Sequence, residues 1–123
     1  MHGFGELEAV IMERLWLRAE PATVRDVLTD LRQHREIAYT TVLTVMDNLY
    51  KKGRLRREPA GRAFRYTPVA DREHYVAQAM HQVLDDSADR AAALTLFVGR
   101  ATLEEAVALR AALADYERKI AGK

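Results

Sequence analysis

Cysteine is absent from the 123 residues, which excludes disulfide bonds, thiolate metal sites and catalysis by a thiol. Long apolar runs are also missing, because none approaches the roughly 20 residues that a membrane-spanning helix needs. The start of the chain, Met1 to Glu6, holds neither a basic nor an apolar segment, so it does not resemble a secretory signal. These absences favour a protein of the reducing cytoplasm without a membrane anchor.

Catalytic patterns are missing as well. The sequence shows no credible Ser-His-Asp order, no Gly-rich phosphate loop and no metal triad. His74 and His81 lie seven residues apart, whereas two ligands on one helix stand three or four apart, so we expect solvated histidines. We therefore expect no enzyme, no cofactor and no metal site.

What is present is the composition of a core-forming protein, with 49% hydrophobic and 30% charged residues. The net charge of +1 hides an uneven distribution, because residues 1–70 hold 12 Lys and Arg against 9 Asp and Glu, whereas residues 71–123 hold 7 against 9. Within residues 50–66, seven basic residues accompany one acid. A local basic patch of this kind favours binding to a polyanion.

The segment from Ala38 to Gly53 predicts a helix with an unusual polar face. Spacing of three and four residues brings four apolar side chains to one face, namely Val42, Val45, Met46 and Leu49. The opposite face and its flanks carry short hydroxyls, an amide, an acid and a lysine: Thr40, Thr41, Thr44, Asp47, Asn48 and Lys51. Short polar groups can hydrogen-bond in a DNA groove without blocking close approach. Asp47 needs a neighbouring cation, since an unpaired acid would repel phosphate.

The flanking segments predict a winged helix-turn-helix. Two helices precede this one, at Glu6–Leu17 and from the capping box at Thr23 to about Arg32, and Ile37 is a candidate for a short strand. Two strands follow, over residues 55–58 and 63–67, with Arg62 in the turn between them. A hairpin directly after such a helix is the wing of a winged-helix domain.

The C-terminal half predicts helices that pair with a second copy. An apolar stripe on the helix from Asp71 includes Tyr75, Val76 and Met80, and the segment 90–98 adds Leu94 and Phe97. After a second capping box at Thr102, the last helix carries a seam that includes Leu109, Leu113 and Tyr116. We expect a DNA-binding domain over residues 1–70 and a dimerisation region over 71–123. The alternative is a monomer with an internal seam.

These residues resemble the penicillinase-repressor family (BlaI/MecI type) of bacterial winged-helix regulators. The resemblance covers nearly the whole chain and rests on the order and spacing of short motifs: Gly5-Glu6-Leu7-Glu8, Leu15-Trp16, Thr23-Val24-Arg25-Asp26-Val27, Ala38-Tyr39-Thr40-Thr41-Val42-Leu43-Thr44-Val45, Leu49-Tyr50-Lys51-Lys52-Gly53, Phe64-Arg65-Tyr66 and Leu94-Thr95-Leu96-Phe97-Val98. It implies a homodimeric repressor of a palindromic operator, controlling genes of the β-lactam or a stress response.

The resemblance also implies roles for single residues. Base-reading positions fall at Thr40, Thr41, Thr44 and Asn48, and backbone contacts fall at Tyr39, Lys51, Lys52, Arg62 and Arg65. In well-known members an Asn-Phe pair in the C-terminal region is cut on induction, but the matching pair here is Leu96-Phe97. The loss of Asn puts induction by that cut in question. The absence of cysteine excludes thiolate copper sensing, which one branch of the family uses.

Two other functions compete with DNA binding. A winged helix can bind proteins instead, and that use would place an apolar, non-basic surface on the outside of the third helix. The C-terminal half could alternatively sense a ligand or metal, although no residue pattern in the sequence indicates which one. For the aromatic residues Trp16, Tyr50, Phe64 and Tyr66, burial in the core is a better prediction than stacking on bases.

Overall fold

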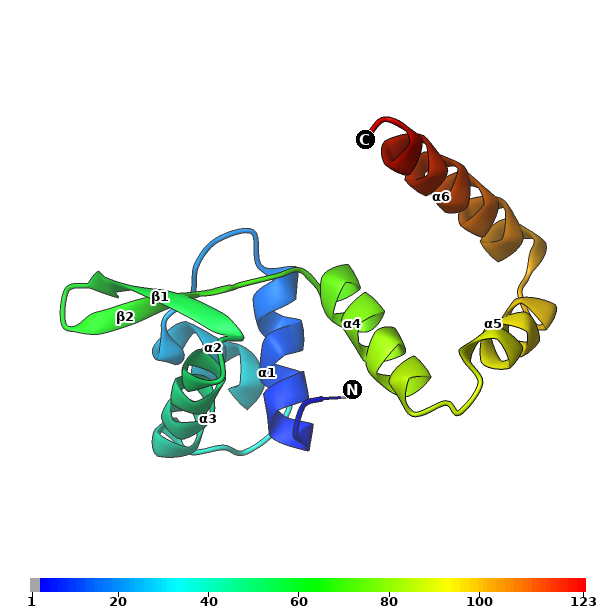
Figure 1. Cartoon of the computed structure of the whole chain (residues 1–123). Helices are drawn as coiled ribbons and strands as arrows, with labels where there is room; N and C mark the ends of the chain where they lie inside the picture. Colours follow the sequence, from blue (N-terminus) through cyan, green and yellow to red (C-terminus); the bar gives the residue numbers. More distant parts are fainter. Residues whose placement is uncertain (1–2) are drawn as a thin grey trace. The chain divides into compact units, whose positions relative to one another are not determined.

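Helices and one β-hairpin make up the computed structural model, which describes residues 3–123. The elements follow one another as α1 (Glu6–Leu17), α2 (Val24–Arg32), α3 (Tyr39–Lys51), β1 (Leu55–Ala60), β2 (Ala63–Pro68), α4 (Arg72–Asp85), α5 (Arg90–Gly99) and α6 (Leu103–Ala121) (Figure 1). The predicted class, mainly α with a small hairpin wing, is confirmed. No helix among the described residues is long and apolar enough to cross a bilayer.

The helix starts follow from local side-chain chemistry. At α2 the Asp26 amide donates to Thr23 Oγ1 at 3.1 Å, and the Thr23 amide donates to Asp26 Oδ2 at 3.0 Å. At α6 the amides of Glu105 and Thr102 make the same exchange, at 3.1 and 2.8 Å. Both predicted capping boxes are therefore confirmed, and each satisfies amides that a helix leaves unpaired at its start.

The core lies between α1, α2, α3 and the base of the hairpin. Each helix contributes apolar side chains spaced three or four residues apart, so that one face of each helix is buried. The residues of this core that are 0–2% exposed include Ile11, Met12, Leu15, Val27, Leu28, Leu31, Val42, Met46, Leu49, Leu55 and Tyr66. Burial of Val42, Met46 and Leu49 turns the polar face of α3 outward.

The hairpin is longer than the sequence indicated. Pro59 pairs with Phe64 and Ala60 pairs with Ala63, so only Gly61 and Arg62 remain in the turn. Gly61 has a φ of +65°, which a residue with a side chain rarely adopts, and this conformation lets the chain reverse within two residues. The wing therefore carries Arg62 at its tip.

A third segment pairs with the hairpin, but it is not the one that we expected. Ile37 forms no strand; instead Ala22, just before α2, bridges Tyr66 of β2. The Ala22 amide donates to the Tyr66 carbonyl at 3.0 Å, and the Tyr66 amide donates to the Ala22 carbonyl at 2.8 Å. Ala22 is small and fully buried, so this connection can approach β2 closely enough for both hydrogen bonds.

The chain divides into two compact units, Met1–Met80 and His81–Lys123, and the division falls within α4. Tyr75 of α4 is 7% exposed and belongs to the core of the first unit. Its ring centroid lies 5.4 Å from that of Phe4 and 5.6 Å from that of Trp16, and its hydroxyl donates to the Arg54 carbonyl at 3.4 Å. Tyr75, which the sequence assigned to dimerisation, thus serves the N-terminal core.

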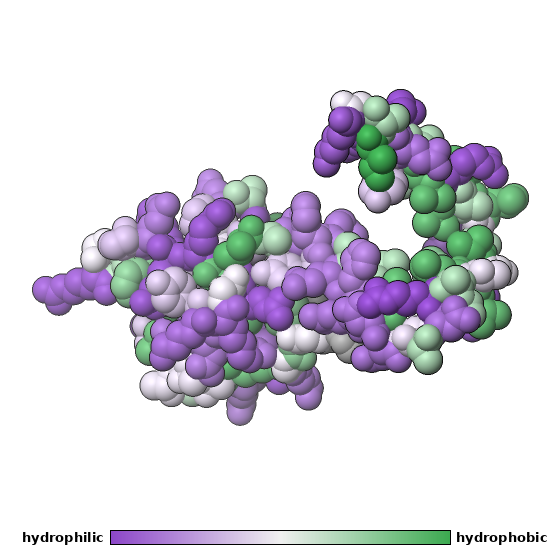
Figure 2. Space-filling view, viewed as in Figure 1, coloured by the Kyte–Doolittle hydropathy of each residue, from purple (hydrophilic) through white to green (hydrophobic). Residues whose placement is uncertain are grey.

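In the second unit, residues 81–123 are all described and none is buried. Figure 2 shows hydrophobic residues on the surface over α5. Large apolar side chains of α5 and α6 that are between 49% and 60% exposed include Leu94, Phe97, Leu113 and Tyr116. Leu109 is half-buried. Two residues of α4 that were also assigned to dimerisation lie in the first unit, where Val76 is 39% and Met80 52% exposed.

Candidate nucleic-acid interface

The outer face of α3 is lined by short polar side chains. Thr40, Thr41, Thr44 and Asn48 are all exposed, and among the described residues their side chains make no hydrogen bond to other protein groups. Their hydroxyl and amide groups are consequently available to an external partner. Hydroxyl and amide side chains at successive turns of a helix match the pattern of donors and acceptors on base edges in the major groove.

Asp47, on the same helix, is paired with two cations. Its Oδ2 lies 2.9 Å from Lys51 Nζ, and its Oδ1 lies 3.3 Å from Arg57 Nη1. The hydrogen bond from Lys51, together with Arg57, lowers the pKa of the Asp47 carboxyl below its ordinary value. The acid is therefore ionised at neutral pH, and its charge is balanced by neighbours before any phosphate approaches.

The cations expected to contact phosphate differ in their availability. Lys51 is engaged by Asp47 and Lys52 by Glu8, each at 2.9 Å, although the two lysine side chains remain 69% and 57% exposed. Arg62 and Arg65 form no ion pair with any residue in the described part of the chain. Exposed pairs contribute little, so a phosphate could replace the acid beside either lysine.

The start of α3 adds a second polar surface. Tyr39 is 39% exposed, and the guanidinium of Arg25 from α2 lies 5.3 Å from the centre of its ring. Ala38, the N-cap, supplies no side-chain cap. The first amides of a helix lack partners within that helix, and the helix dipole favours a negative charge there. This end of α3 is suited to a phosphate.

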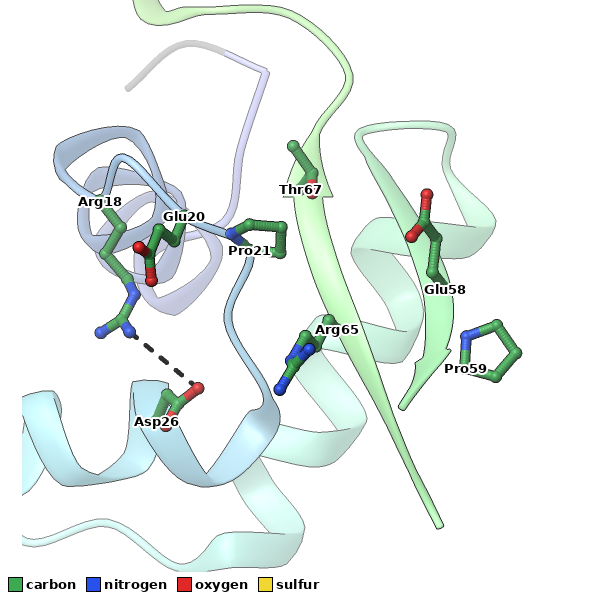
Figure 3. Close-up of a pocket in the computed structure, with 8 residues that line it drawn as sticks. All are labelled: Arg18, Glu20, Pro21, Asp26, Glu58, Pro59, Arg65 and Thr67. Carbon is green, nitrogen blue, oxygen red and sulfur yellow. Dashed lines mark ion pairs between the residues drawn. The ribbon is translucent and has the colours of Figure 1, made fainter. Parts of the chain in front are cut away.

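Arg65 lies at a pocket of about 590 Å³ between β1, β2 and the connection into α2 (Figure 3). In the hairpin register it stands opposite Glu58, and Asp26 also lines the pocket. The Thr23 amide, and the charges of Arg18 and Arg65, lower the pKa of Asp26. The pocket combines acids with guanidinium groups, so its mixed charge provides no particular selectivity for an anion.

The aromatic residues divide into two groups. Tyr66 is 2% exposed and Trp16 is half-buried, as expected of core residues. Tyr50 and Phe64 remain 38% and 39% exposed, so the expectation of burial was wrong for them. Both rings flank Arg57, for which the sequence suggested an acid as partner in place of phosphate but not the stacking on these rings. Its place on the same strand face as buried Leu55 was a signal that it points toward the helices.

The C-terminal pair Leu96-Phe97 lies inside a helix. Both residues belong to α5, where Leu96 is 73% and Phe97 51% exposed.

His74, one of the two histidines on α4, contacts a neighbour in sequence, because its Nδ1 lies 2.6 Å from Asp71 Oδ1.

Comparison with known proteins places these features in context. The model of the penicillinase repressor family matches residues 4–115. The transcriptional regulator BlaI of Mycobacterium tuberculosis, from strains CDC 1551 / Oshkosh and H37Rv alike, is 47% identical over 116 residues, which cover 92% of this chain and 84% of that protein.

Two solved structures are also similar. The DNA-binding domain of the repressor BlaI, determined in solution, aligns with a TM-score of 0.53 and 27% identity over 59% of this chain and 88% of that domain. A MarR family protein from Bacillus stearothermophilus aligns with a TM-score of 0.50 over 98% of this chain and 77% of its own. At 15% identity, the second likeness concerns the fold alone.

Proposed function

The chain belongs to the penicillinase repressor family, and from this membership we propose that it is a DNA-binding transcriptional repressor that acts in the cytoplasm as a homodimer on a palindromic operator. The observation that carries the proposal is the outer face of α3, where exposed hydroxyl and amide groups stand beside a wing whose Arg62 and Arg65 form no ion pair among residues 3–123. A protein-interaction module would instead present apolar groups on that face.

In the proposed complex α3 lies in the major groove. Thr40, Thr41, Thr44 and Asn48 read base edges, since their exposed hydroxyl and amide groups make no hydrogen bond within residues 3–123. Tyr39, Lys51, Lys52, Arg62 and Arg65 contact the phosphate backbone and fix the position of the helix on the duplex. Of the four cations, Arg62 and Arg65 can contact phosphate without breaking any ion pair found among residues 3–123, and Arg62 stands at the wing tip.

The homodimer is supported by the second unit. Its apolar side chains, including Leu94, Phe97, Leu113 and Tyr116, are about half or more exposed. A few hundred Å² of apolar surface left in water would cost several kcal/mol at roughly 25 cal/mol per Å². A second copy with the same exposed faces would cover them symmetrically, and a two-fold dimer matches a palindrome. The dimer surface omits Tyr75, which is buried in the first unit.

From family membership we propose that the regulated genes belong to the β-lactam response or to a stress response. Induction by a cut at Leu96-Phe97 would need α5 to open, because proteases bind extended chain and both residues are helical. We therefore propose that the inducing event is something other than that cut.

The direct test is selection of bound duplexes from a random pool, followed by titration of the recovered site at several salt concentrations. A palindrome with half-sites about one helical turn apart is expected, and the log–log slope against salt should be about −0.9 for each phosphate contacted. Arg62→Ala should reduce the magnitude of the slope by about 1.8, because each protomer of the dimer loses one phosphate contact. Thr44→Ala should change the preferred base and leave the slope unchanged. A slope near zero with wild-type protein would overturn the function.

A further inference from the structure

Arg57 of β1 lies between two aromatic rings that belong to different elements. Its guanidinium carbon is 3.9 Å from the ring centre of Tyr50, in the last turn of α3, and 4.1 Å from that of Phe64, on β2. A planar guanidinium stacks on aromatic faces and is weakly hydrated, which makes arginine suited to such a position. The stack therefore joins the end of α3 to both strands of the wing.

The same guanidinium is held from a third side by Asp47. The Nη1–Oδ1 distance is 3.3 Å, and the two side chains are only 24% and 35% exposed. Within residues 3–123, this is the one side-chain hydrogen bond or ion pair that connects α3 with the strands. The other carboxylate oxygen is taken by Lys51.

The outer part of the wing has few other supports. Leu55 and Tyr66 fix the base of the hairpin, since each is 2% exposed. Beyond Arg57 the hairpin continues to Gly61 and Arg62 through residues that are exposed or half-buried. The angle of this outer part against α3 thus depends on contacts at Arg57.

We propose that Arg57 is a positioning residue: clamped by Asp47, Tyr50 and Phe64, it sets the angle of the wing against α3 and so aims Arg62 at the DNA backbone, without contacting DNA itself. This inference rests on the proposed function. It also accounts for Asp47, an acid on a face that meets a polyanion. The acid holds the arginine that orients the wing.

The decisive experiment is a double-mutant cycle on affinity for the selected operator. Arg57→Met, which keeps an unbranched apolar stem but removes the charged planar group, should weaken binding about tenfold, as should Arg62→Ala. The double variant should lose little more than either single one, because a misdirected wing no longer presents Arg62. Arg57→Lys should behave like Arg57→Met, since an ammonium cannot stack as a planar fork does.

A direct phosphate contact by Arg57 predicts the opposite pattern. Arg57→Lys would then keep most of the affinity, because the charge remains, and the losses from Arg57→Met and Arg62→Ala would multiply. Either result would overturn the positioning role. The thermal stability of each variant is measured as a control. A general loss of stability would also reduce affinity, but it would not produce the non-additive loss in the double variant.

Hydrogen exchange in the DNA-free protein tests the clamp separately. Arg57→Met should accelerate exchange of amides in residues 56–65 and leave those of α1 and α2 unchanged. Arg56→Met is the matched control, because Arg56 is an exposed neighbour on the same strand with no ion pair among the described residues. Unchanged exchange in the wing of Arg57→Met would overturn the inference. Failure of wild-type protein to bind any duplex would overturn the repressor function, while exchange would still decide whether Arg57 holds the wing.

Discussion

In the first unit, α1, α2 and α3 each bury several apolar side chains in one core, whereas no residue of 81–123 is buried. Both units nevertheless contain well-formed helices, and α2 and α6 begin with the same kind of capping box. A regular helix can therefore form without a completed core. Residues close in sequence determine where a helix starts, whereas residues close in space determine whether it is buried. The first unit completes its core within one chain, whereas the exposed apolar side chains of the second are the surface that we propose a second copy covers.

The largest expected effect comes from placing a charge in the proposed dimer surface. Leu113 is 59% exposed and lies on the seam of α6. Leu113→Asp should weaken dimerisation about 100-fold or more, because a charge buried among apolar groups costs several kcal/mol and each 1.4 kcal/mol is tenfold. Sedimentation equilibrium measures the change. Ala111→Asp, on the opposite side of α6, is the control; equal weakening by both variants would contradict the seam.

A core truncation should affect the first unit without involving the second. Leu49 of α3 is fully buried, so Leu49→Ala should lower the free energy of unfolding by about 2–5 kcal/mol. Chemical denaturation followed by circular dichroism measures this loss, which should not depend on protein concentration. Leu17→Ala is the control, since Leu17 is 68% exposed and should change stability by no more than about 0.5 kcal/mol.

The two capping boxes allow the same change to be made in both units. Thr23→Ala and Thr102→Ala each remove the oxygen that caps a helix, and each should cost about 1 kcal/mol. The Thr23→Ala transition should occur at the same denaturant concentration in dilute and concentrated protein. The Thr102→Ala transition should shift with dilution, because the proposed dimer would stabilise α6. Independence of concentration in both variants would argue against an incomplete second unit.

The smallest expected effect is on the stability of the folded protein at acidic pH. The hydrogen bond from Lys52 lowers the pKa of Glu8 below its ordinary value of 4.5. The folded state thus binds the proton more weakly than the unfolded chain, and the resulting stability is present above pH 4.5 and lost as the pH falls through the folded-state pKa. Glu8→Gln should flatten this part of the stability profile. An unchanged acid profile would show that the Lys52 contact is not maintained in solution.

The sequence predicted the features that depend on local chemistry. The period of apolar residues located the helices, the capping boxes at Thr23 and Thr102 located two of their starts, and the alternation around Arg65 located the wing. Burial of one face of α3 also determined which of its polar residues are exposed, including Thr44 and Asn48. These features need no knowledge of distant segments.

What the sequence could not provide was the partner of each surface. The apolar stripe on α4 has the same spacing whether it faces α1 or a second copy, so Tyr75 was assigned to the wrong partner while its burial was expected. The bridge between Ala22 and Tyr66 joins segments that are far apart in the chain, and the pairing of Asp47 with Arg57 joins a helix to the strand that follows it. Periodicity indicates that a face is covered, and three-dimensional packing determines what covers it.

Tyr75 and its neighbours also give the protein a built-in optical reporter. Trp16 is the single tryptophan of the chain, its indole N–H donates to the Ala70 carbonyl at 3.0 Å, and its ring lies 5.6 Å from that of Tyr75. Indole emission responds to the polarity of its surroundings, so release of α4 from α1 would appear as a red shift of the intrinsic fluorescence. The link between the wing and α4 can therefore be followed in unlabelled protein, during DNA titration or dilution, with a fluorimeter.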